Sequence, residues 1–330
     1  MKEFERIHFL DTSIRDIINR PRTQYILLQG RKGWNQLCSA LDLLGDTTLS
    51  IESYWNAEFP AEIGRKYLMI YGVLQSLFLQ QDAIKQIAEV LETHLELPDD
   101  LKKIRDIRNL SIGHPSKKGK GQKQTSHFIS RVTMSKGGFQ LMSSNSEDDR
   151  TYFQTIDLID AIEKQQKLAI KLLEDLLSQL NSRDEEHKKR HRGMKVSDIF
   201  PQTMGYYFSK ILEGTHSQLS AYRGWGKAHV DHVLQKYDAF RKELENRGEL
   251  PANEGIAYEI DEMLYPLNKL RDFFENPEKS NLEPKDAAIF AEFARMRHSE
   301  IAQIAKEIDE RYQEKSEPLN PVDGLENARR

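Results

Sequence analysis

Three side chains near the middle of the sequence are suited to reactions of phosphate esters: Arg108, Asn109 and His114. The guanidinium of an arginine is planar and always charged, and it can hold two phosphate oxygens at once. A histidine titrates close to neutral pH, so it can accept or donate a proton. Because the asparagine follows the arginine directly and the histidine lies six residues after it, the pattern predicts a compact site that binds a phosphate beside a proton acceptor.

Arg108 lies on an unexpected side of its predicted helix. At about 100° per residue, counted from Leu101, Ile104 points to about 300° and Ile112 to about 20°. Arg108 points to about 340°, inside this apolar arc. A guanidinium in a protein keeps its proton, so one that faces a core needs an anion or several hydrogen-bond acceptors there. A bound phosphate is one such anion.

The alternative is that Arg108 serves only the fold. It would then pair with a carboxylate of the preceding long helix, such as Asp82 or Glu89. His114 would be no more than a cap at the C-terminal end of its helix.

The residues around the motif add charge to it. Asp106 supplies a nearby acid, and Arg105 and Asp82 are expected to support the site. The segment after His114 contains four lysines, which make a local basic patch although the whole chain has a net charge of −4. A solvated loop without a specific role is the other interpretation of this segment. The four lysines are Lys117, Lys118, Lys120 and Lys123.

The motif is expected at the end of a helix in a mainly helical unit. Apolar residues predict two short helices or one broken helix between residues 31 and 55, with Asp46 as an N-cap. A long core helix is predicted over residues 60–91, with the proline at its start in the first turn. The next helix is expected over residues 101–113, with Asp99 as its cap.

A small amount of β-structure is predicted after this helix. Alternating residues and a short glycine turn predict a β-hairpin over residues 127–142, and residues 151–156 add a third strand. A further helix is expected over residues 157–181, and it continues into the charge run 183–192. We interpret this run as an exposed helical extension or as a linker.

The C-terminal part is predicted to be wholly helical, and its helices are expected over residues 203–219, 228–247, 254–274 and 284–312. The prediction is therefore a mainly α protein with a helical unit over residues 1–192, which carries the β-hairpin near 126–156. A second, all-helical domain is expected over residues 193–316. Residues 317–330 are expected to be a disordered tail.

Length and composition fit a protein of the cytoplasm. The chain has 330 residues, of which 30% are charged. Its apolar runs are too short to cross a bilayer, and the charged N-terminus lacks the apolar centre of a secretion signal. Cys38 is the only cysteine, which excludes an intramolecular disulfide and a cysteine-rich zinc site. Neither a metal nor a cofactor is expected.

The pattern Arg108-Asn109-x4-His114, at the end of a helix, resembles the motif of the HEPN superfamily, whose enzymes are metal-independent ribonucleases. The resemblance covers about residues 31–181. It implies a HEPN-like helical bundle with an inserted β-hairpin or small sheet. One HEPN toxin group has a tyrosine shortly after the histidine, and this sequence departs from that group because Pro115 and Ser116 follow instead.

The resemblance also implies a mechanism and partners. RNA would be cut by attack of a ribose 2′-hydroxyl on the neighbouring phosphate, leaving a cyclic phosphate and a 5′-hydroxyl. His114 would accept the proton, Arg108 would stabilise the charge of the transition state, and Asn109 would position the histidine or a phosphate oxygen. The lysine-rich segment would steer the RNA backbone. A homodimer with one shared cleft, a toxin or antiphage role, and an antitoxin or other regulatory protein as partner are expected by analogy.

Two other functions fit the same residues. The chain could be a non-catalytic HEPN-like scaffold that binds a nucleotide, RNA or a protein. It could also be a helical adaptor that works through its C-terminal bundle, with a motif that serves the fold.

Arg223 and His229 repeat the spacing of the motif, but Gly224 and Gly226 disfavour a continuous helix there. A loop followed by a helix start is expected instead.

His187 and His191 are four residues apart, which would suit two metal ligands on a helix, but a defined acidic third ligand is missing. Arg297 and His298 are expected on the surface of a charged helix.

Overall fold

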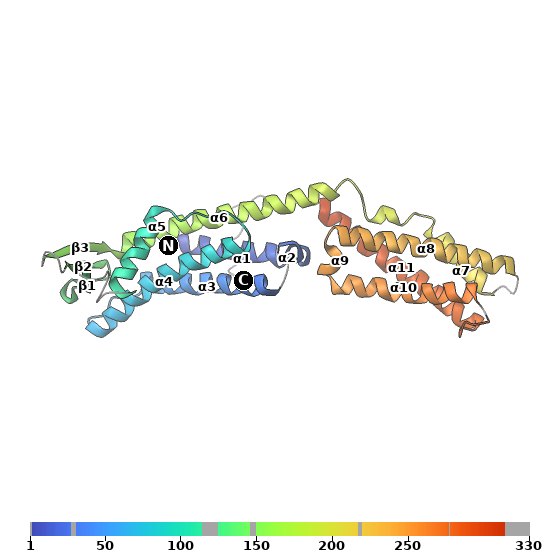
Figure 1. Cartoon of the computed structure of the whole chain (residues 1–330), viewed down its shortest axis with the longest axis horizontal. Coiled ribbons are helices and arrows are strands. Elements are labelled where there is room, and N and C mark those ends of the chain that lie inside the picture. The colour runs from blue at the N-terminus through green and yellow to red at the C-terminus, as the bar shows by residue number, and fades with distance from the viewer. Residues whose placement is uncertain are drawn as a thin grey trace. The chain divides into compact units, whose positions relative to one another are not determined.

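The computed structural model describes residues 2–27, 31–113, 125–145, 150–216, 220–276 and 278–313. These residues form two compact units, each with its own hydrophobic core (Figure 1). Unit 1 contains the residues up to Asn19 and those from Leu27 to Leu180. Unit 2 contains Arg20–Ile26 and the described residues from Asn181 onward.

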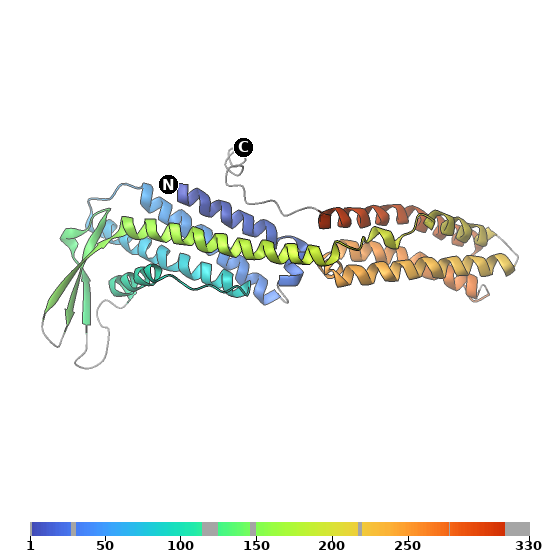
Figure 2. The ribbon, with the colours of Figure 1, turned by 90° about the horizontal axis from the view of Figure 1, so that it is seen from above.

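Unit 1 is built from long helices that run side by side (Figure 2). Their apolar residues recur at helical spacing and meet in one core, which includes Leu10, Leu41, Leu77 and Leu176. The helices are α1 (Lys2–Ile18), α3 (Arg31–Asn56), α4 (Ile63–Val90) and the part of α6 (Leu158–His191) up to Leu180.

Two helix boundaries differ from the prediction. The predicted break between residues 31 and 55 is wrong, because α3 is continuous and Asp46 lies inside it. α3 packs along α4, and this tertiary contact overrides the local capping signal. The long helix begins at Ile63 with Glu62 at its N-cap, so Pro60 precedes the first turn instead of forming part of it.

Buried glutamines join α3, α4 and α6 inside unit 1. The amide of Gln81 donates to Oε1 of Gln165 at 2.8 Å, and the amide of Gln165 donates to Oε1 of Gln80 at 2.9 Å. Gln80 donates in turn to Oγ1 of Thr48 on α3 at 3.1 Å. These polar positions therefore belong to the core, where the glutamines bind one another in place of water.

The predicted hairpin and third strand form an antiparallel sheet with the order β1-β2-β3 in the described residues. One face of the sheet is buried in the core of unit 1, where Ile129, Leu141 and Ile156 lie. The sheet is thus attached to the helices by one face, as is common for antiparallel sheets. The strands are β1 (Thr125–Ile129), β2 (Gly138–Asn145) and β3 (Thr151–Asp157), with the 3₁₀ turn η2 (Arg131–Thr133) between β1 and β2.

Unit 2 contains the C-terminal helices. α7 packs on α8, α8 on α10, and α10 on α11. The helices predicted for this part of the chain are confirmed, with α8 beginning earlier than expected. Their bounds are η3 (Ser197–Ile199), α7 (Met204–His216), α8 (Ser220–Asn246), α9 (Glu249–Ala252), α10 (Glu254–Glu275) and α11 (Pro284–Gln313).

The two glycines near the start of α8 do not interrupt it, so the predicted loop there is wrong. A Cβ at Gly226 would lie 2.7 Å from Cζ of Phe274 on α10. Glycine is needed here because the two helices approach closely, and that packing offsets its low helix propensity.

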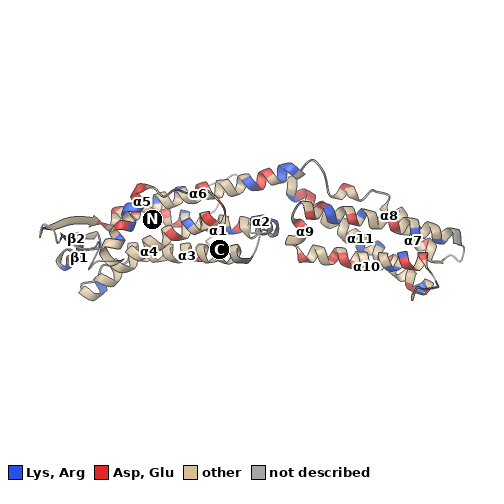
Figure 3. Ribbon diagram, in the orientation of Figure 1, with Lys and Arg blue, Asp and Glu red and all other residues tan. Residues whose placement is uncertain are grey.

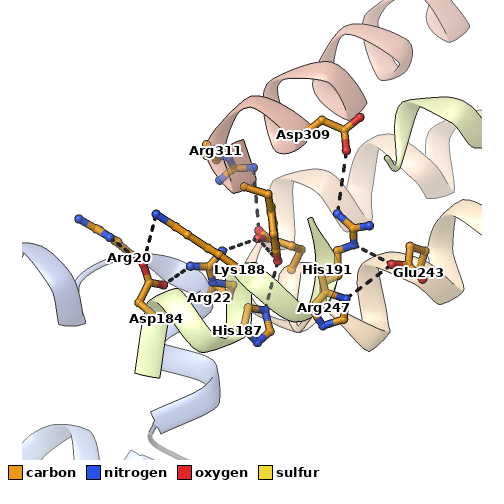
Figure 4. A network of polar contacts seen from close by, with 12 residues as sticks. Arg20, Arg22, Asp184, His187, Lys188, His191, Glu243, Arg247, Asp309 and Arg311 are labelled. Atoms are coloured by element: carbon orange, nitrogen blue, oxygen red, sulfur yellow. Dashed lines mark hydrogen bonds and ion pairs between the residues drawn. The ribbon is translucent and has the colours of Figure 1, made fainter. Parts of the chain in front are cut away.

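The charge run at the end of α6 is helical to His191, but it is not exposed throughout and is not a linker. The side chains of Asp184 and Lys188 are only 4% and 7% exposed. Asp184 pairs with Lys188 and with Arg22 of α2 (Pro21–Leu27), in the polar network that Figure 4 shows. The prediction of a solvated run is wrong because residues distant in sequence, such as Arg22, bind side chains of the run.

The described chain is therefore mainly α with a small antiparallel sheet. None of its helices combines the length and the apolar composition that a membrane span requires. Residues 317–330, predicted as a tail, lie outside the described residues.

Candidate functional site

Arg108 is the last residue of α5 (Asp99–Arg108), and a π-helical turn, η1 (Asn109–Gly113), follows at once. Asp99 lies in the first turn of α5 and the N-cap is Pro98, so the predicted cap is displaced by one residue. π turns are rare and are frequent at functional sites. Here the turn contains Asn109, the second residue of the motif.

The guanidinium of Arg108 is held by neutral oxygens. Nε and Nη2 donate to Oε1 of Gln75 on α4, at 3.0 and 2.7 Å, and Nη1 donates to Oδ1 of Asn109 at 3.1 Å. An arginine has five N–H donors, and these bonds use three of them. One N–H on each Nη is left, and no described residue accepts from it.

The neighbouring Arg105 takes the carboxylate that could have neutralised Arg108. Its Nη1 lies 2.7 Å from Oδ1 of Asp82 on α4. The alternative in which Arg108 pairs with Asp82 or Glu89 is therefore not what the described residues form. Arg108 is half-buried, not sealed in the core, and its charge has no carboxylate partner there.

Both arginines lie over one aromatic ring of α4. The guanidinium carbons of Arg105 and Arg108 are 3.8 and 4.5 Å from the ring centroid of Phe78. Such cation–π contacts stabilise a cation without removing its charge. The ring and Gln75 together fix the plane of the Arg108 guanidinium.

Gly113 lies at the end of the π turn, next to this guanidinium. A Cβ at position 113 would be 2.9 Å from Nη1 of Arg108 and 3.4 Å from Oδ1 of Asn109. The absence of a side chain at Gly113 leaves room for the Nη1 group at this position. The next residue in the sequence is His114.

Several predicted site residues lie elsewhere or cannot be placed. Asp106 is exposed and has no ion pair within the described part of the chain. His114 lies outside the described residues, as do the lysines predicted to bind RNA, Lys117, Lys118, Lys120 and Lys123.

The sequence-based prediction missed Gln75 and Phe78. They stand three residues apart on α4, and Asp82 follows four residues later, so all three share one helix face. The available signal was a polar, an aromatic and an acidic residue at this spacing on one face of α4. His127 was also missed. It lies on β1, which contacts η1, and its Nδ1 is 2.8 Å from Oγ of Ser143.

The other histidine motifs serve the packing of unit 2. Burial lowers the pKa of His187 to about 4, with a further contribution from the charge of Arg22. His187 lies 3.3 Å from the hydroxyl of Tyr312. Among the described residues, no group of three or more His, Cys, Asp or Glu side chains is arranged to hold a metal ion.

The prediction that His298 is a surface residue is wrong. Its Nδ1 lies 2.9 Å from the hydroxyl of Tyr237, and burial lowers its pKa to about 4. In the repeat of the motif on α8, Nδ1 of His229 lies 2.7 Å from the backbone oxygen of Trp225 in its own helix.

Comparison with known proteins found no similar family, no similar curated protein and no similar solved structure.

Proposed function

We propose that unit 1 is a metal-independent endoribonuclease of the HEPN type, in which Arg108, Asn109 and His114 cut RNA. The observation that carries this proposal is the state of Arg108. Its guanidinium is fixed by Gln75, Phe78 and Asn109, yet among the described residues two of its N–H groups have no acceptor and no carboxylate neutralises it. A fixed, uncompensated cation in a half-buried place is suited to stabilise an anionic transition state.

In this proposal the ribose 2′-oxygen attacks phosphorus while His114 accepts the 2′-hydroxyl proton. The bond from phosphorus to the 5′-oxygen breaks, and that oxygen takes up a proton to leave as a hydroxyl. The products are a 2′,3′-cyclic phosphate and a 5′-hydroxyl. Arg108 holds two nonbridging oxygens as the charge on them grows, and Asn109 positions Arg108 by accepting from Nη1.

The expected biological setting follows from the same resemblance. The enzyme would act as a homodimer with one shared cleft, as a toxin or antiphage effector, and an antitoxin or other regulatory protein would restrain it. This part of the proposal depends on analogy alone.

The test is cleavage of RNA by the purified full chain in the presence of a chelator. Arg108→Ala and His114→Ala are each expected to lower the cleavage rate at least about 100-fold, and the products should carry cyclic phosphate ends. Arg65→Ala and His94→Ala are matched controls, since both side chains are exposed and lie outside the motif. Unchanged cleavage in the motif variants refutes the proposal, and RNA binding without any cleavage favours the non-catalytic scaffold.

A further inference from the structure

One row of side chains crosses all three strands of the sheet in unit 1. Phe128 of β1 is paired in register with Met142 of β2, and Met142 is paired with Phe153 of β3. Residues paired directly across strands point to the same face of a sheet. The two phenylalanines therefore stand on one face with the methionine between them.

This row lies on the outer face of the sheet. Phe128 and Phe153 are 55% and 61% exposed, whereas Ile129 and Leu141, one position along, are buried. Figure 2 shows the strands extending beyond the ends of the helices of unit 1. Single exposed apolar residues are ordinary, but two exposed rings aligned in register make a continuous apolar strip.

The rest of the outer face is polar and almost uncharged. It carries the side chains of Gln140, Ser144, Thr151 and Thr155, which can donate and accept hydrogen bonds. The ribbon of the strands is almost free of charged residues (Figure 3). The only Asp, Glu, Lys or Arg of the described strands is Asp157 at the end of β3, on this outer face, and its Oδ1 accepts from the backbone N–H of Asp160. The face thus offers ring surfaces and neutral hydrogen-bonding groups, and its one carboxylate in the described strands lies four residues along β3 from Phe153.

From these features we infer that the outer face of the sheet binds the unpaired bases of single-stranded RNA, with Phe128 and Phe153 each stacking against one base. The inference rests on the proposed function and names the form of its substrate. Aromatic rings on a sheet are a general means of holding single-stranded nucleic acid, because every base has a flat π face. Strands are about 4.8 Å apart, so two rings separated by one strand lie about 10 Å apart, which leaves room for a base on each.

The sheet also lies next to the candidate catalytic turn. β1 contacts η1, the turn that contains Asn109 and ends at Gly113. An RNA strand whose bases rest on the sheet can therefore pass over the edge strand β1 toward Arg108. Stacking on the sheet would select unpaired RNA, since bases in a duplex do not expose their faces.

The test measures binding separately from cleavage. A fluorescein-labelled single-stranded oligoribonucleotide of mixed sequence is titrated with the full chain carrying His114→Ala, and its anisotropy is followed. Phe128→Ala and Phe153→Ala are each expected to weaken binding about tenfold or more. Unlabelled single strands should compete well and an RNA duplex poorly. Val132→Ala is the control, because Val132 is 95% exposed in η2 and lies outside the row.

Leucine variants separate a stacked base from an apolar protein partner. Phe128→Leu and Phe153→Leu keep an apolar side chain without a flat ring, so they should lose RNA binding as the alanine variants do, whereas Phe153→Trp should retain it. Binding that leucine preserves, or that neither alanine variant weakens, overturns the inference. A result in which the alanine variants change only the sedimentation of the chain also overturns the inference, because it would assign the face to contact with a second copy of the chain.

The same experiments separate this inference from the proposed function. If the wild type binds through the two rings but does not cleave RNA, the ribonuclease proposal fails and the binding face stands. If the wild type cleaves RNA but the substitutions of the two rings do not weaken binding, the ribonuclease proposal stands and the inferred binding face fails.

Discussion

Arg108 donates two hydrogen bonds to one oxygen of Gln75, from Nε at 3.0 Å and from Nη2 at 2.7 Å. The acceptor is the carbonyl of a neutral amide on α4. It fixes the plane of the guanidinium without neutralising its positive charge. A carboxylate in the same place would fix the guanidinium equally well but would neutralise it.

This relationship predicts that Gln75→Glu lowers RNA cleavage without unfolding the chain. The new carboxylate would pair with Arg108 and compete with the phosphate. A charge-assisted hydrogen bond is worth about 1.5–3 kcal/mol, so the cleavage rate should fall about tenfold or more while the melting temperature stays equal or rises. Gln86→Glu is the matched control, because it makes the same change at another half-buried position of α4, and it should leave cleavage unchanged. Full activity in Gln75→Glu would show that the charge of Arg108 is not used.

Gly113→Ala is predicted to displace the guanidinium of Arg108. Its Cβ would lie 2.9 Å from Nη1, and the end of a flexible side chain can shift to relieve that contact. Cleavage should fall about tenfold or more, because misplacement of a catalytic group is costly. Gly72→Ala is the matched control. It lies in α4 with no atom within 4 Å of the added Cβ, so it should leave cleavage unchanged and stabilise the helix by about 0.5–1 kcal/mol.

The buried glutamines predict a stability effect within unit 1. Gln80 is fully buried and exchanges hydrogen bonds with Thr48, Gln165 and Gln166. Gln80→Ala leaves a cavity and unpaired amides, so the free energy of unfolding should fall by about 2–3 kcal/mol. Gln154→Ala, on the exposed strand β3, should change it by less than about 0.5 kcal/mol. Equal effects in chemical denaturation would show that the amide network does not stabilise unit 1.

The helices and the sheet could be predicted because their signals are local. The spacing of apolar residues predicted α4 and the C-terminal helices. The alternating residues around positions 127–142 predicted the paired strands β1 and β2. The predictions failed where a distant partner decides the outcome. Asp46 lies inside a helix because α3 as a whole packs along α4, and Gly226 lies inside a helix because Phe274 of α10 packs against it.

The same limit applies to the candidate site. The spacing of the motif picked out Arg108 and Asn109, which do interact. It could not identify Gln75, which stands 33 residues before Arg108 in the sequence. The two residues become neighbours only when α4 and α5 pack against each other. Asp184 was read as solvated for a similar reason, since its partner Arg22 is 162 residues away.

His298 predicts a pH dependence for the stability of unit 2. Burial lowers its pKa to about 4 from an ordinary value of 6.5. As the pH falls from about 6.5 to about 4, the unfolded chain binds a proton that the folded unit does not, so the free energy of unfolding falls in this window and is regained as the pH rises. Urea unfolding at about pH 7 and about pH 5 should show a smaller loss for His298→Gln than for the wild type. An identical loss in both would contradict the assignment to His298.

Arg247 tests whether the polar network of Figure 4 stabilises unit 2. It has no exposed side-chain surface, its Nε lies 2.7 Å from Oε1 of Glu243, and its guanidinium lies 4.9 Å from the ring centroid of Tyr312. Arg247→Met leaves a buried carboxylate without its cation, so the free energy of unfolding should fall by about 3–5 kcal/mol.

The double variant Arg247→Met with Glu243→Gln removes both charges, and it should be less destabilised than the sum of the two single variants. Arg241→Met is the matched control on the same helix. Its guanidinium also faces a glutamate four residues away, Glu245, but the side chain of Arg241 is 37% exposed, so the loss should be below about 1 kcal/mol. Hydrogen exchange of α8 and α11 in the full chain measures these changes in unit 2 directly. Equal losses for Arg247→Met and Arg241→Met would mean that burial of the pair adds nothing to its contribution.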